Sequence, residues 1–247
     1  MRKSVLPLPM VLLLPLLVGS AGGVAPVSDG PPPLWSLISD RQQVRVFRQS
    51  GTGHGDDRHD FAIRGTTRFA LRDEYALVAV LRDYAAYPQW LHFVTEVDEL
   101  APGADGSRRL RFATRLPWPL RDREALLESR LVRNATAADQ VTVALSNRPG
   151  LLPPDPDYVR VPRLHGSLAF RRLGDDRVEV DYRLRLDPGG DLPAWLARLL
   201  LRDAAHFTLR RLRAAVRQPR YQGHYYSGLE LRGPGRPARA ENVTKPQ

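Results

Sequence analysis

Cysteine is absent from this sequence of 247 residues. The chain therefore has no disulfide framework, no lipid-modified cysteine, no thiolate metal site and no thiol nucleophile, and its folded part must be stable through its core alone. Lysine is almost absent as well, since Lys3 and Lys245 are the only ones. Arginine therefore supplies nearly all of the positive charge behind the formal net charge of +10.

The sequence also lacks the short motifs that carry common catalytic chemistry. It contains no glycine-rich phosphate loop, no serine at a nucleophile elbow and no cluster of metal ligands. His54 and His59 lie in a polar loop without a third ligand nearby, so we interpret them as solvated side chains. We accordingly predict no catalytic residue, no bound metal and no cofactor.

Long apolar runs are missing except near the N-terminus, at residues 5–18. Prolines interrupt this run, and it is shorter than a membrane span needs. Two basic residues precede it and small residues follow as far as Ala25, which is typical of a secretory signal. We predict a signal peptide over residues 1–25 and export to the periplasm or beyond the cell. An uncleaved N-terminal anchor is the alternative.

The arginines are spread along the chain and alternate with aspartate and glutamate. This pattern is typical of the arginine bias of a GC-rich genome. The alternative is a surface that makes transient contact with an anionic membrane. Nucleic acid is not an expected partner, because no basic patch interleaved with aromatic residues occurs and because we expect export.

Composition predicts one folded domain. A linker rich in proline and glycine covers residues 26–33, and the domain is expected at 34–218. With 43% hydrophobic residues, the chain has enough apolar side chains for a single packed core. Residues 219–247 are rich in glycine, proline and arginine, so we expect a flexible tail there.

Hydrophobic periodicity predicts an α+β domain. Residues 34–38 are expected to form a short helix-like opener. A first helix is capped by Asp73 and ends before Pro88, and the longest helix opens at Asp191 and runs to Gln218. Alternation of apolar and polar residues predicts antiparallel strands with one apolar and one solvated face. The predicted strands are 43–47, 60–69, 94–100, 108–115, 124–133, 141–146, 159–171 and 177–186.

The last predicted helix has one broad apolar face and an opposite face bearing arginines. The small residues Ala197, Ala204 and Thr208 lie on the apolar face. They either leave space for a ligand or let the helix approach the sheet closely. The sequence favours neither interpretation.

Four segments carry a family resemblance: 83–90 (DYAAYPQW), 118–124 (WPLRDRE), 161–171 and 181–195. In this order and at this spacing they resemble the START (StAR-related lipid transfer) domain family, within the helix-grip, Bet v 1-like superfamily. The resemblance extends over residues 35–218. It implies a curved antiparallel β-sheet that wraps a long C-terminal α-helix, with a lipid-sized cavity between them.

The resemblance also implies a set of ligand-binding residues. Arg121 and Asp122 are interpreted as a structural ion pair at the start of a strand. Sterol-carrying members of the family place charges inside the cavity, whereas residues 125–127 are apolar, which disfavours a sterol ligand. The residues expected to line the cavity or its lid are Phe112, Leu127, Tyr182, Leu200, Ala204, Phe207 and Thr208.

These observations lead to the hypothesis of an exported carrier or sensor that binds a lipid or another hydrophobic small molecule and catalyses no reaction. The alternative is an enzyme of the cyclase, aromatase or hydratase type that uses the same cavity. Such an enzyme needs convergent titratable groups. The candidates in the sequence are His165, His206, Asp203 and Tyr182.

Overall fold

The structure of this chain is a computed structural model that describes residues 34–50, 59–73, 75–133, 140–173 and 176–226. The predicted signal peptide and linker, His54 and the chain after residue 226 lie outside the described residues. Within the described residues, no helix has the length and apolar character needed to cross a membrane.

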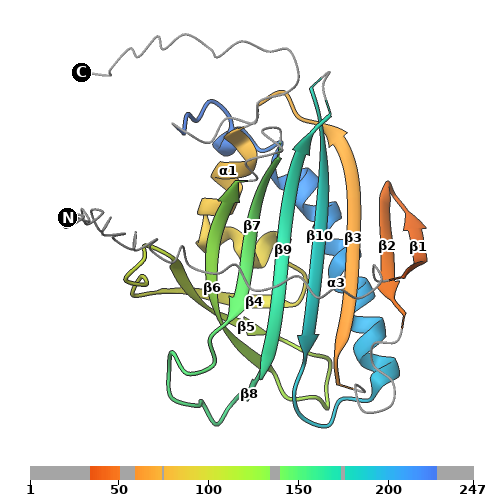
Figure 1. The fold of residues 1–247 in the computed structure, drawn as a ribbon, viewed down its shortest axis with the longest axis vertical. Coiled ribbons are helices and arrows are strands. Elements are labelled where there is room, and N and C mark those ends of the chain that lie inside the picture. The colour runs from red at the N-terminus through yellow and green to blue at the C-terminus, as the bar shows by residue number, and fades with distance from the viewer. Residues whose placement is uncertain (1–33, 51–58, 74, 134–139, 174–175, 227–247) are drawn as a thin grey trace, which may run out of the picture. The chain divides into compact units, whose positions relative to one another are not determined.

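One ten-stranded sheet curves around the C-terminal helix α3, Ala194–Ala215 (Figure 1). The strand order is β1-β2-β3-β10-β9-β7-β6-β5-β4, and the short β8 runs parallel to β6 while the other pairings are antiparallel. This arrangement confirms the predicted α+β helix-grip fold. The strands are β1 (Trp35–Arg41), β2 (Val44–Gln49), β3 (Phe61–Ala70), β4 (Val94–Leu100), β5 (Arg108–Thr114), β6 (Arg123–Arg133), β7 (Gln140–Asn147), β8 (Val159–Arg160), β9 (Arg163–Arg172) and β10 (Arg177–Asp187).

Strand β10 shows how sequence alternation becomes a two-sided sheet. It pairs with β3 and β9, with Val180 opposite Thr67 on one side and Phe170 on the other. Val178 and Val180 are buried, whereas Asp181 is half-buried and pairs with arginines. Because successive side chains point to opposite faces, the apolar residues of β10 reach the concave face that α3 covers.

The first strand corrects the prediction for residues 34–38, which belong mostly to β1 rather than to a helix-like opener. β1 pairs with β2 through a turn at Gln42 and Gln43, whose φ angles are 53° and 64°. Positive φ at both central residues is typical of a type I′ hairpin turn, which favours asparagine and glycine. A Gln-Gln pair gives no such signal, so the sequence did not reveal the hairpin.

Helix α1, Tyr75–Arg82, begins at the predicted cap, because Asp73 Oδ1 accepts a hydrogen bond from the Tyr75 N–H at 2.9 Å. A 3-10 turn (Tyr84–Ala86) and the short helix α2 (Tyr87–Trp90) follow. The first helix thus ends before Pro88 as predicted. Pro88 itself lies in the first turn of α2, where a helix needs no N–H donor.

Helix α3 crosses the concave face and packs on β2, β3 and β10 (Figure 1). The helix was predicted to open at Asp191, but its N-cap is Pro193, and no side chain caps it. The helix and the sheet meet most closely at Gly65 of β3. A Cβ at Gly65 would lie 2.7 Å from Leu209 Cδ1 and 3.5 Å from Ala205 Cβ. The missing side chain at Gly65 therefore sets how near α3 lies to the sheet.

The chain after α3 remains folded through residue 226, which corrects the predicted start of the flexible tail at residue 219. Pro219–Tyr221 forms a 3-10 turn, and Tyr221 is buried. The Tyr221 hydroxyl donates to Asp83 Oδ2 at 2.8 Å, and the Gly223 N–H donates to Asp73 Oδ2 at 2.7 Å. These bonds join the segment after α3 to the residues that flank α1 on either side.

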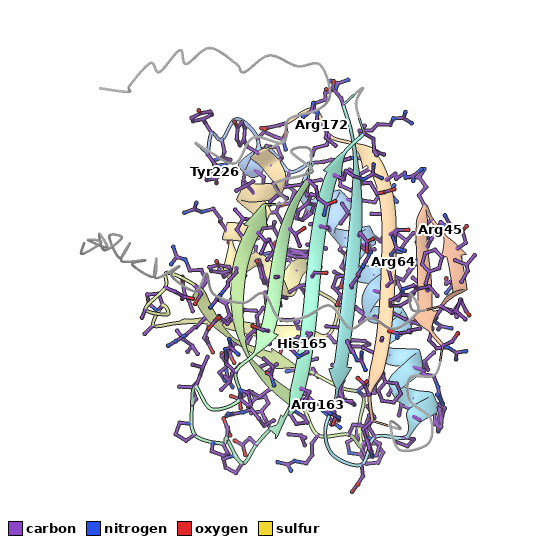
Figure 2. The ribbon with its side chains drawn as sticks, in the orientation of Figure 1. Arg45, Arg64, Arg163, His165, Arg172 and Tyr226 are labelled. Atoms are coloured by element: carbon purple, nitrogen blue, oxygen red, sulfur yellow. The ribbon has the colours of Figure 1, made fainter. Side chains whose placement is uncertain are left out.

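The outer face of the sheet carries arginines paired with acids on neighbouring positions (Figure 2). Asp181 Oδ2 lies 2.6 Å from Arg64 Nη2, and Asp181 Oδ1 lies 3.1 Å from Arg183 Nε. Burial disfavours the Asp181 carboxylate, but hydrogen bonds from Arg183 and Arg64 outweigh it and lower its pKa. Glu179 is likewise held between two arginines. These pairs neutralise positive charge locally.

Candidate ligand-binding cavity

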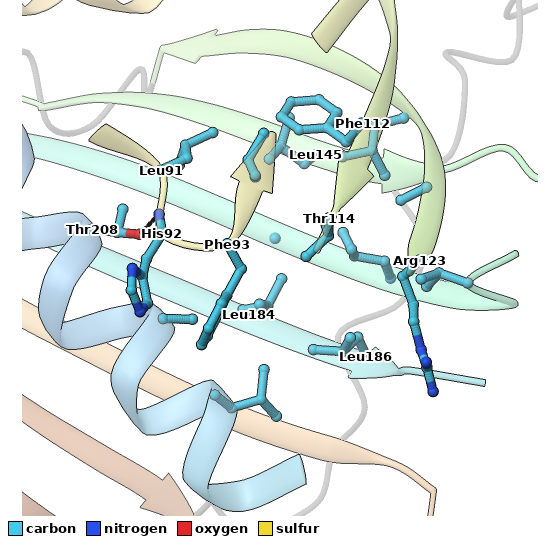
Figure 3. A pocket seen from close by; sticks show the side chains of 18 of the residues that line it. Leu91, His92, Phe93, Phe112, Thr114, Arg123, Leu145, Leu184, Leu186 and Thr208 are labelled. Atoms are coloured by element: carbon cyan, nitrogen blue, oxygen red, sulfur yellow. Dashed lines mark hydrogen bonds between the residues drawn. The ribbon is translucent and has the colours of Figure 1, made fainter. Parts of the chain in front are cut away.

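A cavity of about 220 Å³ lies between the concave face of the sheet and α3. Strands β5, β6, β7, β9 and β10 supply its wall, while α3 and the segment from α2 to β4 close it (Figure 3). Most of the side chains that line it are leucine, valine, alanine or phenylalanine. The arrangement is therefore that of an apolar small-molecule site.

The structure brings most of the predicted ligand-binding residues to this cavity. Phe207 is the exception, because it does not line the cavity; its ring centroid lies 4.7 Å from that of His92 and 5.1 Å from the guanidinium carbon of Arg210. The predicted residues that line the cavity are Phe112, Leu127, Tyr182, Leu200, Ala204 and Thr208. Their contact with a ligand stays a prediction.

Small residues have two separate roles along α3. Ala197, Ala204 and Thr208 line the cavity, where their short side chains leave space. Close approach to the sheet is instead the role of Ala205, which faces Gly65. The helix thus presents one strip of residues to β3 and a second strip to the cavity. The two interpretations left open by the sequence apply to different residues of the same helix.

Gly166 of β9 also leaves space in the cavity wall. A Cβ added there would meet Leu184 Cδ1 at 3.5 Å and Leu145 Cβ at 3.6 Å, which are ordinary contacts. All three residues line the cavity. A larger side chain at Gly166 would therefore fit the backbone and extend into the cavity.

A polar contact closes one end of the cavity. The His92 N–H donates a hydrogen bond to Thr208 Oγ1 at 3.0 Å and so joins the segment before β4 to α3 (Figure 3). Burial, followed by the positive charge of Arg211, lowers the pKa of the His92 imidazole. His92 is therefore neutral at pH 7. No motif surrounds His92 in the sequence, so its place in the cavity was not predicted.

Arg123, the first residue of β6, lines the opposite end of the cavity (Figure 3). It is 6% exposed. Its Nη1 donates to the Arg121 carbonyl, its Nη2 donates to the Gly189 carbonyl at 3.2 Å, and its Nε is buried without a partner. Burial, followed by the charge of Arg121, lowers the pKa of the guanidinium, but not enough to neutralise it at pH 7. The sequence predicted that β6 begins at Glu124, one residue later, so Arg123 was not expected in the cavity wall.

Glu124, the next residue, points to the other face of the sheet and is 2% exposed. Its Oε2 lies 2.7 Å from Arg111 Nε, and its Oε1 lies 2.7 Å from Arg160 Nη2. Burial opposes the charge of Arg111, but hydrogen bonds to Glu124 and to two further acids outweigh it and raise its pKa. Two successive residues of β6 thus have different roles: Arg123 places a charge at the cavity, and Glu124 holds an ion network on the other face.

The predicted ion pair between Arg121 and Asp122 is wrong. Arg121 Nη2 donates to the carbonyls of Pro156 and Tyr158, and Asp122 Oδ1 accepts from the Leu116 N–H at 3.1 Å. Both residues lie before β6, where the chain has not yet entered the sheet, so their side chains bind loop backbone instead. Their structural role is to hold the loops at the start of β6.

The groups proposed for an enzyme do not converge. His165 is exposed on the outer face of the sheet (Figure 2), and Asp203 pairs with Arg202 at 3.0 Å. His206 is buried but does not line the cavity, whereas Tyr182 does, and burial raises the pKa of its hydroxyl. Among the described residues, no group of three His, Asp or Glu side chains is placed to hold a metal ion.

A curved antiparallel sheet around a long C-terminal helix, with an apolar cavity between them, defines the helix-grip class of proteins. Residues 77–213 match the family described as "Polyketide cyclase / dehydrase and lipid transport". The chain belongs to this family. The description covers both enzymes and lipid transport.

Individual relatives support the same conclusion. An uncharacterized protein of Pseudomonas aeruginosa is 30% identical over 183 residues, covering 74% of this chain and 86% of that protein. A STAR-related lipid transfer protein from Xanthomonas axonopodis has a TM-score of 0.64 at 27% identity, covering 74% of this chain and 99% of that one. Human STARD10, at 20% identity and a TM-score of 0.63, shares the fold over 74% of this chain and 72% of that one. These similarities confirm the START resemblance.

Proposed function

We propose that the chain binds a hydrophobic small molecule, such as a lipid with one acyl chain, in the cavity under α3 and acts as a carrier or sensor of it. The observation that carries the proposal is the apolar cavity of about 220 Å³. Each methylene moved from water into such an interior contributes about 0.8 kcal/mol. An acyl chain could therefore be held without covalent chemistry.

The lining of the cavity favours binding over catalysis. Its ionisable side chains are Tyr87, His92, Arg123 and Tyr182, and they do not form a hydrogen-bonded set among themselves. General acid–base catalysis needs a proton donor or acceptor placed within hydrogen-bond reach of the reacting group and oriented by a further partner. The name of the Xanthomonas axonopodis relative, a lipid transfer protein, supports the same choice.

We further propose that the protein works outside the cytoplasm. The support is the sequence of residues 1–25, with its basic start, short apolar run and small residues. N-terminal sequencing of protein recovered from the periplasm or the medium tests this proposal. A start near residue 26 is expected, and full-length protein confined to the cytoplasm would contradict it.

Ligand binding is tested with a pair of matched glycine variants. Gly166→Leu places a side chain in the cavity, whereas Gly150→Leu adds the same side chain at a loop position with nothing within 4 Å. We expect near-stoichiometric binding of a fluorescent acyl probe by the wild type and by Gly150→Leu, and a loss of at least ~10-fold in affinity for Gly166→Leu. Mass spectrometry of the purified wild type is expected to reveal a copurifying lipid. Absence of both lipid and probe binding would refute the proposal.

A further inference from the structure

We propose that the ligand is an amphiphile with an oxyanion, a carboxylate or a phosphate ester, on a single apolar chain, and that Arg123 binds this oxyanion. The inference rests on the proposed function and adds two properties of the ligand, its negative charge and its single apolar chain. The Arg123 guanidinium has more N–H donors than it has acceptors around it.

Arg123 is a buried cation at the cavity wall with spare hydrogen-bonding capacity. A guanidinium has five N–H donors, and here two of its nitrogens reach the backbone carbonyls of Arg121 and Gly189. The Nε–H is buried and has no partner. Among the described residues, Arg123 forms no ion pair, and the acid that acts on its charge is its neighbour in sequence, Asp122, whose Oδ1 accepts from the Leu116 N–H. The side chain thus keeps its charge and at least one donor for a ligand.

The ion network on the other face of β6 contrasts with the surroundings of Arg123. Arg111 and Arg160, also mostly buried, both bind the carboxylate of Glu124 on the other face of β6. Burial of a charge without a counter-ion is unfavourable, and an incoming anion relieves that cost. Of the side chains that line the cavity, Arg123 is the charged one, since His92 is neutral at pH 7. The electrostatic complement of the cavity is therefore a single anion.

The position of Arg123 also fixes how the ligand lies. The guanidinium lies at the end of the cavity formed by Thr114 and Leu186, while His92 and Thr208 lie at the other end (Figure 3). The wall between the two ends is apolar. An anion at Arg123 therefore directs an apolar tail along the cavity toward α2. A volume of about 220 Å³ is small for a ligand pocket, which favours one chain over the two chains of a phospholipid.

The turn between β10 and α3 holds the guanidinium in place. Gly189 and Gly190 have φ angles of +68° and +64°, a region that strongly favours glycine. The carbonyl of Gly189 accepts from Arg123 Nη2, and a Cβ at Gly190 would lie 3.6 Å from the same nitrogen. These two glycines act as positioning residues for the proposed anion site.

The first experiment compares a fluorescent long-chain fatty acid with its methyl ester, using purified full chain at pH 7. Wild-type protein is expected to bind the acid at least ~10-fold more tightly, since hydrogen bonds to charged groups are stronger than neutral ones. Arg123→Gln is expected to abolish this preference while ester binding changes less than ~2-fold. The control Arg163→Gln, at a side chain 68% exposed on the outer face, is expected to keep the preference.

The outcomes separate this inference from the proposed function. If neither probe binds the wild type, the proposed function fails and this inference fails with it. If both probes bind the wild type equally, the function stands and the anion site is refuted. If Arg123→Gln does not fold, the wild-type preference for acid over ester still decides. Equal preference in Arg123→Gln and wild type would refute the role of Arg123.

Competition against the bound acid probe distinguishes the two sources of the oxyanion. Unlabelled fatty acid supplies a carboxylate, lysophosphatidic acid supplies a phosphate ester, and a monoacylglycerol of the same chain length supplies neither. The stronger anionic competitor identifies the headgroup. Displacement by the monoacylglycerol as effective as that by both anions would overturn the proposal.

Discussion

Glu124→Gln is expected to destabilise the protein by removing one charge from a buried ion network. The Glu124 carboxylate is 2% exposed and contacts two arginines whose side chains are 14% and 16% exposed. Arg111 keeps two further acids, Glu96 and Asp98, whereas the other bonds of Arg160 go to neutral backbone carbonyls. Glutamine preserves the shape but leaves Arg160 without a counter-ion.

Removal of one partner from a fully buried pair costs about 3–5 kcal/mol. Because both arginines keep some exposure, we expect a loss near the lower limit, about 3 kcal/mol in the free energy of unfolding. For a domain of this size, a loss of that magnitude lowers the melting temperature by roughly 6–12 °C. Urea unfolding followed by circular dichroism measures the change.

The matched control is Glu99→Gln, which breaks an ion pair of 2.7 Å with Arg108 in which the two side chains are 51% and 44% exposed. Exposed pairs contribute about 0–1 kcal/mol, so this variant is expected to remain close to the wild type. The two substitutions are chemically identical and differ mainly in burial. Equal destabilisation by Glu124→Gln and Glu99→Gln would refute the reasoning from burial.

Three further predictions concern the packing of α3, the C-terminal turn and the pH dependence of stability. Gly65→Ala is expected to lower the free energy of unfolding by about 1–3 kcal/mol because its Cβ would crowd Leu209. In urea unfolding, the double variant Gly65→Ala, Leu209→Ala should lose less stability than the sum of the two single variants. Tyr221→Phe removes the hydrogen bond to Asp83 and is expected to lower the free energy of unfolding by about 1.5–3 kcal/mol; an unchanged value would show that the bond is not formed in solution. Asp181 has a lowered pKa in the folded state, so its contribution to the free energy of unfolding is fully present above about pH 4 and is lost as the pH falls through the folded-state pKa. The difference in free energy of unfolding between wild type and Asp181→Asn should therefore narrow on acidification. A difference that widened would contradict the assignment.

Periodicity identified most of the fold because most elements have a face that must be buried. Strand β10 alternates along its length, and Asp73 caps α1 where the sequence places it. Edge strand β1 was missed because its residues are largely exposed, so burial imposes no alternation on them. Residues 219–226 were assigned to a tail because composition does not reveal that Tyr221 is buried beside α1.

The candidate site was predictable as a face but not as a set of side chains. The apolar side of α3 faces both β3 and the cavity, so a single apolar stripe on the helix predicted Phe207 to line the cavity, although its ring contacts His92 and does not line it. At β6 the predicted start differs from the observed one by a single residue, and that difference hid Arg123. The structural ion pair was therefore predicted between Arg121 and Asp122 in the loop, whereas the buried ion pairs form at Glu124.

The charges at the start of β6 also fix how this strand aligns with its neighbours. Arg123 lies opposite Thr114 of β5, and Glu124 lies opposite Ala113. Slipping β6 by one position would turn every side chain to the other face. Glu124 would then point into the apolar cavity without a cation beside it. Arg123 would lie next to Arg111 and Arg160, which would have lost the Glu124 carboxylate they share. Two adjacent residues of opposite charge thus favour the observed alignment of β6 over one shifted by a single position.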